Sequence, residues 1–383
     1  MTYSWSRTAI PIAAIFSFRM LGLFLLIPVF TLYASNLQYA TPTLIGFALG
    51  AYGLSQGLLQ IPFGMLSDRF GRKPIITFGL LLFAFGSLVG ALTDSIWGMI
   101  FARTLQGTGA VGSVLIALLA DLTSEEQRTK AMAVIGVSIG GSSSLAMVLS
   151  PAIAAYYGLA GIFYVTLALA LLGILILHTL IPTPVHESFH KDTEANPSLF
   201  KSVITNTQLQ KLNLGIFCQH FILTSTFFAV PMILRQQIES GNLTQQWHFY
   251  LPVIILSFLA MIPFIIIAEK KKKMMPIFLL AIATLSVSQG LLAFYNLNWI
   301  LLYALIFVYF IAFNFLEASL PSLISKKANQ SNKGTAMGIY STCQFLGIFV
   351  GGALSGILFQ WQGNQAIFAV NSLLAILWFI VGR

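Results

Sequence analysis

Charge is scarce in this chain of 383 residues, of which only 8% are Asp, Glu, Lys or Arg. Soluble domains carry about 25% charged residues, so this composition excludes an ordinary soluble enzyme. Cysteine is scarce too, with Cys218 and Cys343 alone in the chain. Both lie in apolar stretches, where we expect small apolar packing residues and neither a disulfide nor a metal pair.

Apolar residues are abundant instead: 57% of the chain is hydrophobic and the mean hydropathy is +0.86. A helix that spans a bilayer needs roughly 20 mainly apolar residues. About twelve windows meet this requirement, near residues 8–34, 42–66, 74–93, 95–121, 130–155, 161–181, 209–237, 245–268, 276–295, 298–325, 334–358 and 363–382. The sequence therefore predicts an all-α membrane protein with twelve transmembrane helices.

The basic residues indicate an orientation. If the N-terminus is cytoplasmic, about seventeen Lys and Arg residues fall on the cytoplasmic side, and only Arg235 falls on the other. This bias predicts that both termini are cytoplasmic. It also explains the formal charge of +9 by topology and by contact with the lipid bilayer, so no nucleic-acid partner is expected.

The longest polar stretch, residues 182–208, lies midway along the chain and predicts a central cytoplasmic loop between residues 1–181 and 209–383. The two halves repeat short patterns, for example Ile61-Pro62-Phe63 and Ile262-Pro263-Phe264. Two six-helix halves related by duplication are typical of secondary transporters, whose substrate site lies between the halves near the middle of the membrane.

A polar motif, G-x-x-x-D-R-x-G-R-K, separates the second and third spans, and R-x-x-Q-G begins at Arg103 in the fourth. Together with the two six-helix halves, these motifs resemble the major facilitator superfamily. The resemblance implies two pseudo-symmetric six-helix bundles that move a small molecule, and in many members protons, by alternating access. It also implies a monomer in the bacterial inner membrane that needs no cofactor.

The polar motif predicts a conformational latch on the cytoplasmic face. Two glycines permit a close helix approach and a tight turn, and the basic residues can pair with the carboxylate at the end of the fourth span. The resemblance adds that the motif aspartate engages the start of the eleventh helix, near Gly334. The predicted latch residues are Gly64, Asp68, Arg69, Gly71, Arg72, Lys73 and Asp121. The alternative is that these charges only orient the loop.

The second half keeps the charges of this motif but not its glycines, which are replaced by Ile265 and Lys272. We therefore expect no matching tight turn there, and a weaker second latch.

Charged residues deep in a span are costly and indicate function. Glu317 is the only carboxylate deep in an apolar window, which makes it the candidate proton carrier, with His220 as the second candidate because histidine titrates near neutrality. Arg19 and Arg103 are expected to supply counter-charge or to contact an anion. The resemblance implies that all four line the central cavity. The alternative is structural pairing between helices.

The fifth span bears on the direction of transport. Antiporters of this superfamily often carry Gly-Pro with spaced glycines there, whereas this chain has Ser150-Pro151. The antiporter signature is therefore degraded, although small residues remain and allow close packing. The resemblance favours proton-driven export, and proton-coupled uptake is the alternative.

One motif points to an enzyme. His186-Glu187-Ser188-Phe189-His190 fits H-E-x-x-H, the pattern of a zinc protease, and Asp192 or Glu194 could add a ligand. It lies in the central loop with no domain around it to shield a metal, so we interpret it as a solvated linker. A passive channel is disfavoured because nothing resembles a selectivity filter.

Overall fold

The computed structural model describes residues 5–184, 194–294, 298–329 and 332–383, and these are almost entirely helical. In the first half the helices are α1 (Trp5–Phe24), α2 (Phe30–Ala34), α3 (Pro42–Phe70), α4 (Arg72–Leu92), α5 (Ile96–Thr108), α6 (Gly112–Leu122) and α7 (Glu125–Thr179). After the short helices η1 (Pro197–Leu199) and α8 (Phe200–Ile204) follow α9 (Thr207–Glu239), α10 (Trp247–Lys270), α11 (Met274–Leu292), α12 (Trp299–Lys327) and α13 (Lys333–Gly382).

These helices confirm the prediction of twelve spans. Both α7 and α13 contain two spans each, which are separated where Gly158 and Gly363 take positive φ angles of 61° and 70°. Positive φ is readily available only to glycine, so the chain can turn at these two points.

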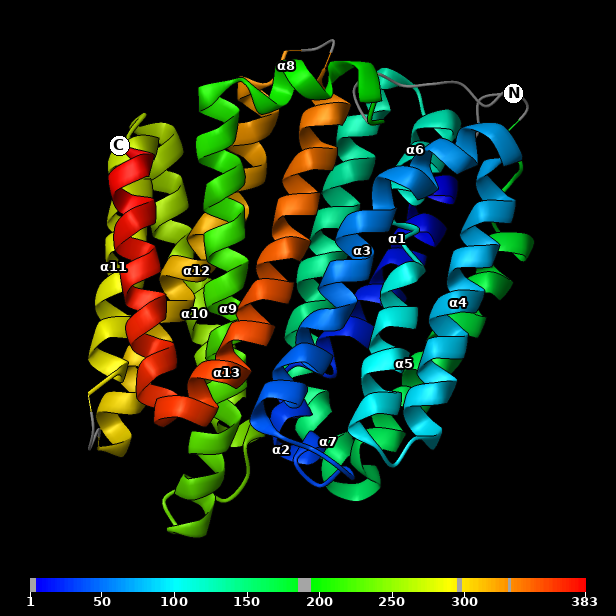
Figure 1. The fold of residues 1–383 in the computed structure, drawn as a ribbon. Helices are drawn as coiled ribbons and strands as arrows, with labels where there is room; N and C mark the ends of the chain where they lie inside the picture. Colours follow the sequence, from blue (N-terminus) through cyan, green and yellow to red (C-terminus); the bar gives the residue numbers. More distant parts are fainter. Residues whose placement is uncertain (1–4, 185–193, 295–297, 330–331) are drawn as a thin grey trace.

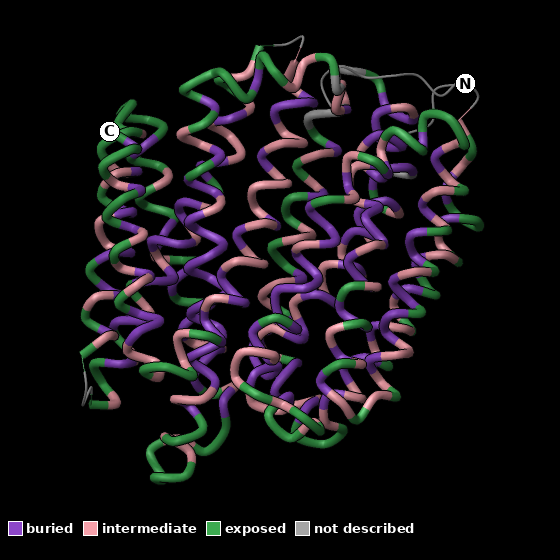
Figure 2. The backbone as a smooth tube through the Cα atoms, viewed as in Figure 1, coloured by how far each residue is buried: buried purple, intermediate pink, exposed green. Residues whose placement is uncertain are grey.

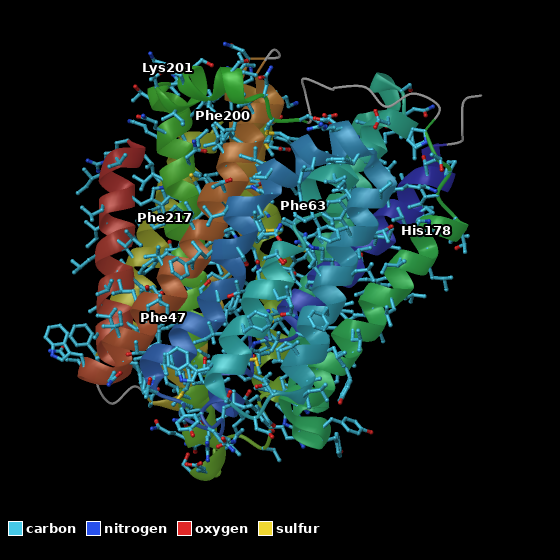
Figure 3. The ribbon with its side chains drawn as sticks, turned by 45° about the vertical axis from the view of Figure 1, so that its right-hand side comes forward. Phe47, Phe63, His178, Phe200, Lys201 and Phe217 are labelled. Atoms are coloured by element: carbon cyan, nitrogen blue, oxygen red, sulfur yellow. The ribbon has the colours of Figure 1, made fainter. Side chains whose placement is uncertain are left out.

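The helices form two bundles that lie side by side (Figure 1). Helices α1 to α7 pack mainly on one another, as do α9 to α13, and the most extensive contact between the bundles joins α3 to α13. Buried residues follow the inner helices, whereas the outer helix faces are largely exposed (Figure 2). Helix α8 lies at the same end of the molecule as the C-terminus, with Phe200 and Lys201 on its surface (Figure 3).

Two predicted spans are interrupted. The first breaks between α1 and α2, around Pro28, which has no N–H to donate to the preceding turn. The fourth breaks at residues 109–111 between α5 and α6, where Gly109 approaches α4 so closely that an added Cβ would lie 2.3 Å from the carbonyl oxygen of Gly79. Ile27 in the first break and Gly112, directly after the second, line the cavity between the bundles.

The bundles meet tightly at the end opposite α8. An added Cβ at Gly46 of α3 would lie 2.4 Å from the carbonyl oxygen of Gly352 in α13, and one at Gly50 would lie 2.6 Å from that of Phe349. Small residues let two helices approach in this way within a membrane. The hydroxyl of Thr43 donates to Oε1 of Gln360 at 2.6 Å, which extends this contact to the start of α3 and to the end of the first span within α13.

The first half of α7 presents an uncovered face. Val137 is 78% exposed, and among the described residues nothing lies within 4 Å of a Cβ added at Gly136, Gly140 or Gly141. No other described segment therefore covers this face of α7 at residues 136–141.

The connection in the second half differs from the one in the first. Gly71, with a φ of 94°, is the single residue between α3 and α4, whereas Lys271, Lys272 and Lys273 separate α10 from α11. Lys272 nevertheless has a positive φ of 54°, a conformation that costs a lysine about 1 kcal/mol more than a glycine.

Candidate transport cavity and charge cluster

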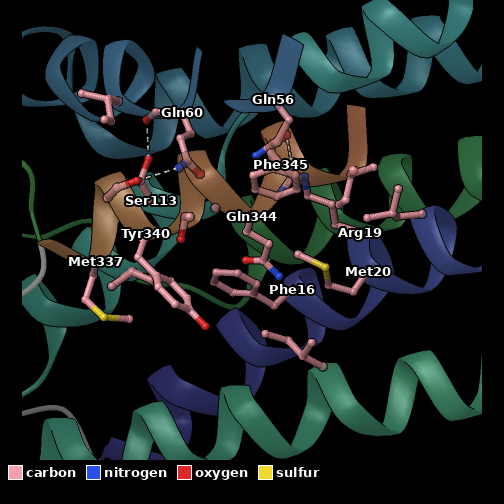
Figure 4. A pocket seen from close by; sticks show the side chains of 18 of the residues that line it. Phe16, Arg19, Met20, Gln56, Gln60, Ser113, Met337, Tyr340, Gln344 and Phe345 are labelled. Atoms are coloured by element: carbon pink, nitrogen blue, oxygen red, sulfur yellow. Dashed lines mark hydrogen bonds between the residues drawn. The ribbon is translucent and has the colours of Figure 1, made fainter. Parts of the chain in front are cut away.

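A cavity of about 360 Å³ lies between the two bundles, with walls from α1, α3, α5, α6, α7, α9, α12 and α13. Most of its lining is apolar, and Figure 4 shows Phe16, Met20, Tyr340 and Phe345 around it. This volume lies within the range of about 300–1,000 Å³ that is usual for small-molecule sites. All four candidate residues of the spans, Arg19, Arg103, His220 and Glu317, line it.

The wall from the second bundle carries Glu317 and His220. The Glu317 Oε2 atom lies 3.8 Å from the His220 Nε2 atom and accepts a hydrogen bond of 2.9 Å from the Gln219 side chain. The Gln344 amide nitrogen is 2.8 Å from the same His220 nitrogen. The Glu317 side chain is 40% exposed to the cavity, so a proton can reach this carboxylate.

Gln344 suits an imidazole that changes its protonation state. Its amide carries both a donor and an acceptor, and rotation of the amide exchanges them. The same side chain can therefore donate to neutral His220 or accept from the protonated ring. At 3.8 Å, Glu317 and His220 interact through charge and form no hydrogen bond with one another.

The wall from the first bundle holds the two arginines. Arg19 in α1 is 2% exposed, and its Nη2 atom donates to the hydroxyl of Tyr52 at 3.0 Å and to the side-chain oxygen of Gln56. Arg103 in α5 lies over the Tyr52 ring, 4.9 Å from its centroid, and donates to Gln106 at 2.8 Å. Tyr52 thus contacts both guanidinium groups, a role that sequence reasoning missed because tyrosines are common in apolar helices.

The four residues consequently divide into two pairs on opposite bundles. Among the described residues, no carboxylate forms an ion pair with Arg19 or Arg103.

Arg72 is the centre of a charge cluster at the end of the bundles near α8. It is 1% exposed and contacts four side chains. These are Asp68 (2.5 Å), Asp121 (3.1 Å), Glu194 (2.9 Å) and Ser67 (2.6 Å). The sequence-predicted pairing of the basic motif with Asp121 is therefore made by Arg72.

The other basic residues of the motif lie outside the cluster. Arg69 is exposed, with its guanidinium carbon 5.5 Å from the centroid of the Phe70 ring. Lys73 donates to the carbonyl oxygen of Ile181 at 2.5 Å. Gly71 makes the turn that brings Arg72 back toward α3, and Gly64 lies in the cavity wall beside Ser113.

Glu194 joins the cluster from the central loop, which sequence reasoning did not anticipate. Its backbone lies against the start of α13, so that a Cβ added at Gly334 would lie 2.2 Å from the Glu194 carbonyl oxygen. The next-but-one residue, Asn196, donates its backbone N–H to the Thr335 hydroxyl at 2.9 Å. Residues 194–196, called here the central strap, thus link Arg72 of the first bundle to α13 of the second.

The zinc motif gains no support. His186, Glu187, His190 and Asp192 lie outside the described residues, and Glu194 is engaged by Arg72. Within the part of the chain that the structure describes, no group of three or more His, Cys, Asp or Glu residues is placed to hold a metal ion.

Two helical bundles with a cavity between them are the architecture of many secondary transporters. A family model described as Major Facilitator Superfamily matches residues 212–383, and one described as Sugar (and other) transporter matches residues 29–112. The chain belongs to the major facilitator superfamily, as its motifs indicated.

Two relatives align with nearly the whole chain. The chain is 43% identical over 382 residues to the inner membrane transport protein YajR of Escherichia coli strain K12, an alignment that covers 100% of this chain and 84% of that protein. It is 35% identical over 376 residues to an uncharacterized transporter of Buchnera aphidicola subsp. Baizongia pistaciae, covering 98% and 95% of the two chains.

Solved structures share the fold at low sequence identity. A bacterial homologue of the human lysosomal transporter Spinster, inward-facing and occupied, matches with a TM-score of 0.76 at 12% identity over 98% of this chain and 95% of that chain. The E. coli xylose transporter XylE, partially occluded and inward open, matches with a TM-score of 0.75 at 14% identity over 98% and 97%.

Proposed function

We propose that this protein is a proton-coupled exporter of small organic molecules, in which Glu317 and His220 form the proton site. The observation that carries the proposal is the 3.8 Å approach of these two titratable side chains in the wall of the cavity. Both face the space that a cargo would occupy, so binding of the cargo and binding of a proton influence one another through charge.

The coupling follows from the cost of moving a charge through an apolar barrier. A carboxylate that is sealed from water during the change of state is destabilised unless it is neutralised by a proton or a partner. Protonation of Glu317, or of His220 beside it, lowers this cost. The transporter then changes between its two access states at a useful rate only when the proton site is protonated or when a cargo is bound in the cavity.

The Arg72 cluster is proposed as the cytoplasmic latch. Support comes from its composition, because a single buried guanidinium contacts Asp68, Asp121 and Glu194, and the last of these belongs to the strap that touches α13. Separation of the bundles at this end would have to break the strap contacts. This end is proposed to be cytoplasmic, with both termini on that side of the inner membrane.

Export is proposed over uptake on the packing of the fifth span. Ser150 is buried and donates to the carbonyl oxygen of Leu25, and Ala146 and Ala154 on the same face of α7 are buried too. Close packing is therefore retained where antiporters of this superfamily carry glycines. Uptake with a proton remains the alternative and predicts the opposite direction of accumulation.

The experiment measures accumulation in proteoliposomes with an imposed pH gradient, using a panel of radiolabelled organic anions, organic cations and sugars. We expect at least one compound to be driven against its gradient, in the direction opposite to the protons. An uncoupler that dissipates the pH gradient should abolish this accumulation. Glu317→Gln is expected to reduce driven accumulation about tenfold or more while exchange of cargo without a gradient persists. Glu239→Gln, an exposed residue paired with Arg235, is the matched control.

Two results would contradict the proposal. One is driven accumulation that survives the uncoupler, and the other is full proton-driven accumulation by Glu317→Gln. Cargo that moves in the same direction as the protons would instead replace export by uptake and leave the proton site in place.

A further inference from the structure

Positive charge in the cavity wall is not matched by negative charge. Arg19 and Arg103 are each 2% exposed, and both contribute to the lining. Within the described residues the Nε and Nη1 atoms of Arg19, and the Nε atom of Arg103, have no hydrogen-bond partner. A buried guanidinium normally pairs with an anion, because desolvation of an unpaired charge is costly.

The carboxylates that line the same cavity are committed elsewhere. Asp68 and Glu194, near its cytoplasmic end, both contact Arg72. Glu317 lies on the second bundle, opposite Arg19, where it accepts a hydrogen bond from Gln219 and lies beside His220. The chain itself therefore supplies no counter-charge for Arg19 among its described residues.

A helix N-terminus adds to the positive potential at Arg19. Helix α6 begins at Gly112, after the break in the fourth span, and its N-cap residue Val111 gives no side-chain cap. A Cβ added at Gly112 would lie 3.4 Å from the Arg19 Nη1 atom, so the first turn of α6 adjoins the guanidinium. N–H groups of a first turn lack partners within the helix, and the helix dipole is positive there.

An interrupted span whose second segment begins at the cavity is a known arrangement for binding an anionic group. Gly112, Ser113 and Ile116 of α6 line the cavity together with Arg19. Around them lie apolar side chains, including Phe16 and Met20 in Figure 4, that fit the rest of an amphipathic molecule.

We infer that the cargo is an amphipathic organic anion, whose carboxylate is held by Arg19 Nε and Nη1 and by the start of α6. Its apolar body lies against α1 and α13. This inference rests on the proposed function, since it assigns the cargo of the same cavity. It requires the cavity to bind an anion but does not depend on proton coupling.

The test uses three probes with one apolar body and different charge: 1-naphthoate, 1-naphthamide and 1-naphthylmethylammonium. Their dissociation constants are measured with purified full-length protein in a neutral detergent, without any gradient, against empty micelles as blank. We expect naphthoate to bind about tenfold or more tightly than either analogue, because a charge-assisted hydrogen bond to a buried guanidinium contributes that much.

Arg19→Gln is expected to weaken naphthoate binding about tenfold or more and to leave naphthamide binding within about twofold. Arg19→Lys keeps the charge but loses the planar guanidinium, so its affinity for naphthoate should lie between those of the wild type and Arg19→Gln. Arg235→Gln, on the surface, is the control for loss of a cation. Gly112→Ala should weaken naphthoate binding as well, because the added methyl group contacts Nη1.

Equal binding of the three probes, preference for the ammonium, or unchanged naphthoate binding in Arg19→Gln would each overturn the inference. If Arg19→Gln does not fold, the charge preference of the wild type and the effect of Gly112→Ala decide. Binding of the three probes is measured without a gradient, so it is a readout independent of proton coupling. Loss of proton coupling with retained anion binding would therefore refute only the proposed function, and the reverse result would refute only this inference.

Discussion

At the scale of single residues, Arg72 shows how one buried side chain can organise several segments. Its guanidinium contacts Asp68 in its own motif, Asp121 at the end of α6 and Glu194 in the central strap. Five N–H donors in a rigid plane allow one arginine to do this, whereas lysine could not reproduce the geometry. The contact with Glu194 is the one that extends to the second bundle.

Glu194→Gln should loosen the central strap. The change removes one charge from a buried ion pair, so we expect the free energy needed to open the strap to fall by about 1.4 kcal/mol or more. The Asn196 amide, which donates to the Thr335 hydroxyl, reports on this opening and should exchange its hydrogen about tenfold faster. Hydrogen exchange measured by mass spectrometry checks the result.

Glu239→Gln is the matched control because it breaks an exposed pair with Arg235, which contributes little to stability. Unchanged exchange at Asn196 in Glu194→Gln would mean that the strap is held by its backbone packing on Gly334 and not by the ion pair.

Residues of the charge cluster and the cavity could be predicted from the sequence where a motif fixed their spacing. Asp121 could be paired with the basic motif because both lie at ends of spans on the same side. Glu194 could not, because a carboxylate in a polar loop carries no signal of where the loop folds. Tyr52 was missed for a similar reason: its contacts with Arg19 and Arg103 depend on the crossing of helices and not on any local pattern.

At the scale of helices, the length and apolar character of the spans predicted the fold well. The interruptions were harder to predict. Proline at position 28 is a visible helix breaker, whereas the break at residues 109–111 depends on how closely Gly109 packs on Gly79 of α4. Where the second half has Lys272 in place of the motif glycine, three residues separate α10 from α11 instead of one, as the loss of the glycine led us to expect.

The glycines of α3 predict a matched pair of variants. Gly50→Val places a branched side chain where a Cβ already meets the Phe349 carbonyl oxygen at 2.6 Å, so it should force α3 and α13 apart. Gly140→Val adds the same side chain to the uncovered face of α7, where nothing described lies within 4 Å. We expect Gly50→Val to lower the melting temperature by several degrees, consistent with about 1–3 kcal/mol for overpacking, and to shift the distance between spin labels on α3 and α13.

Gly140→Val should leave the melting temperature and the distance between the spin labels unchanged. It is expected to slow transport if the α7 face closes against the other bundle during the cycle. A Gly50→Val protein with unaltered stability and distances would show that the α3–α13 contact adapts without cost, which the backbone proximity argues against.

At the scale of the whole molecule, the two bundles touch tightly at the end opposite α8, and the strap crosses the other end. Alternating access requires both arrangements to be reversible, since the cavity must open to each side in turn. The α3–α13 contact is therefore expected to separate in every cycle, however well it packs in the present state.

A cross-link across this contact tests that requirement. Thr43 and Gln360 are joined by a hydrogen bond of 2.6 Å, with Gln360 exposed and Thr43 half-buried, so Thr43→Cys together with Gln360→Cys can be linked by a short thiol-specific reagent. We expect the linked protein to lose transport in proteoliposomes almost completely, because the closed end cannot open. Naphthoate binding in detergent should persist, because the cavity is still reached from the end near α8. Each single cysteine variant, treated with the same reagent, should transport normally, which excludes damage by labelling alone. Transport at the original rate by the linked protein would mean that the cargo leaves by a path that does not separate α3 from α13.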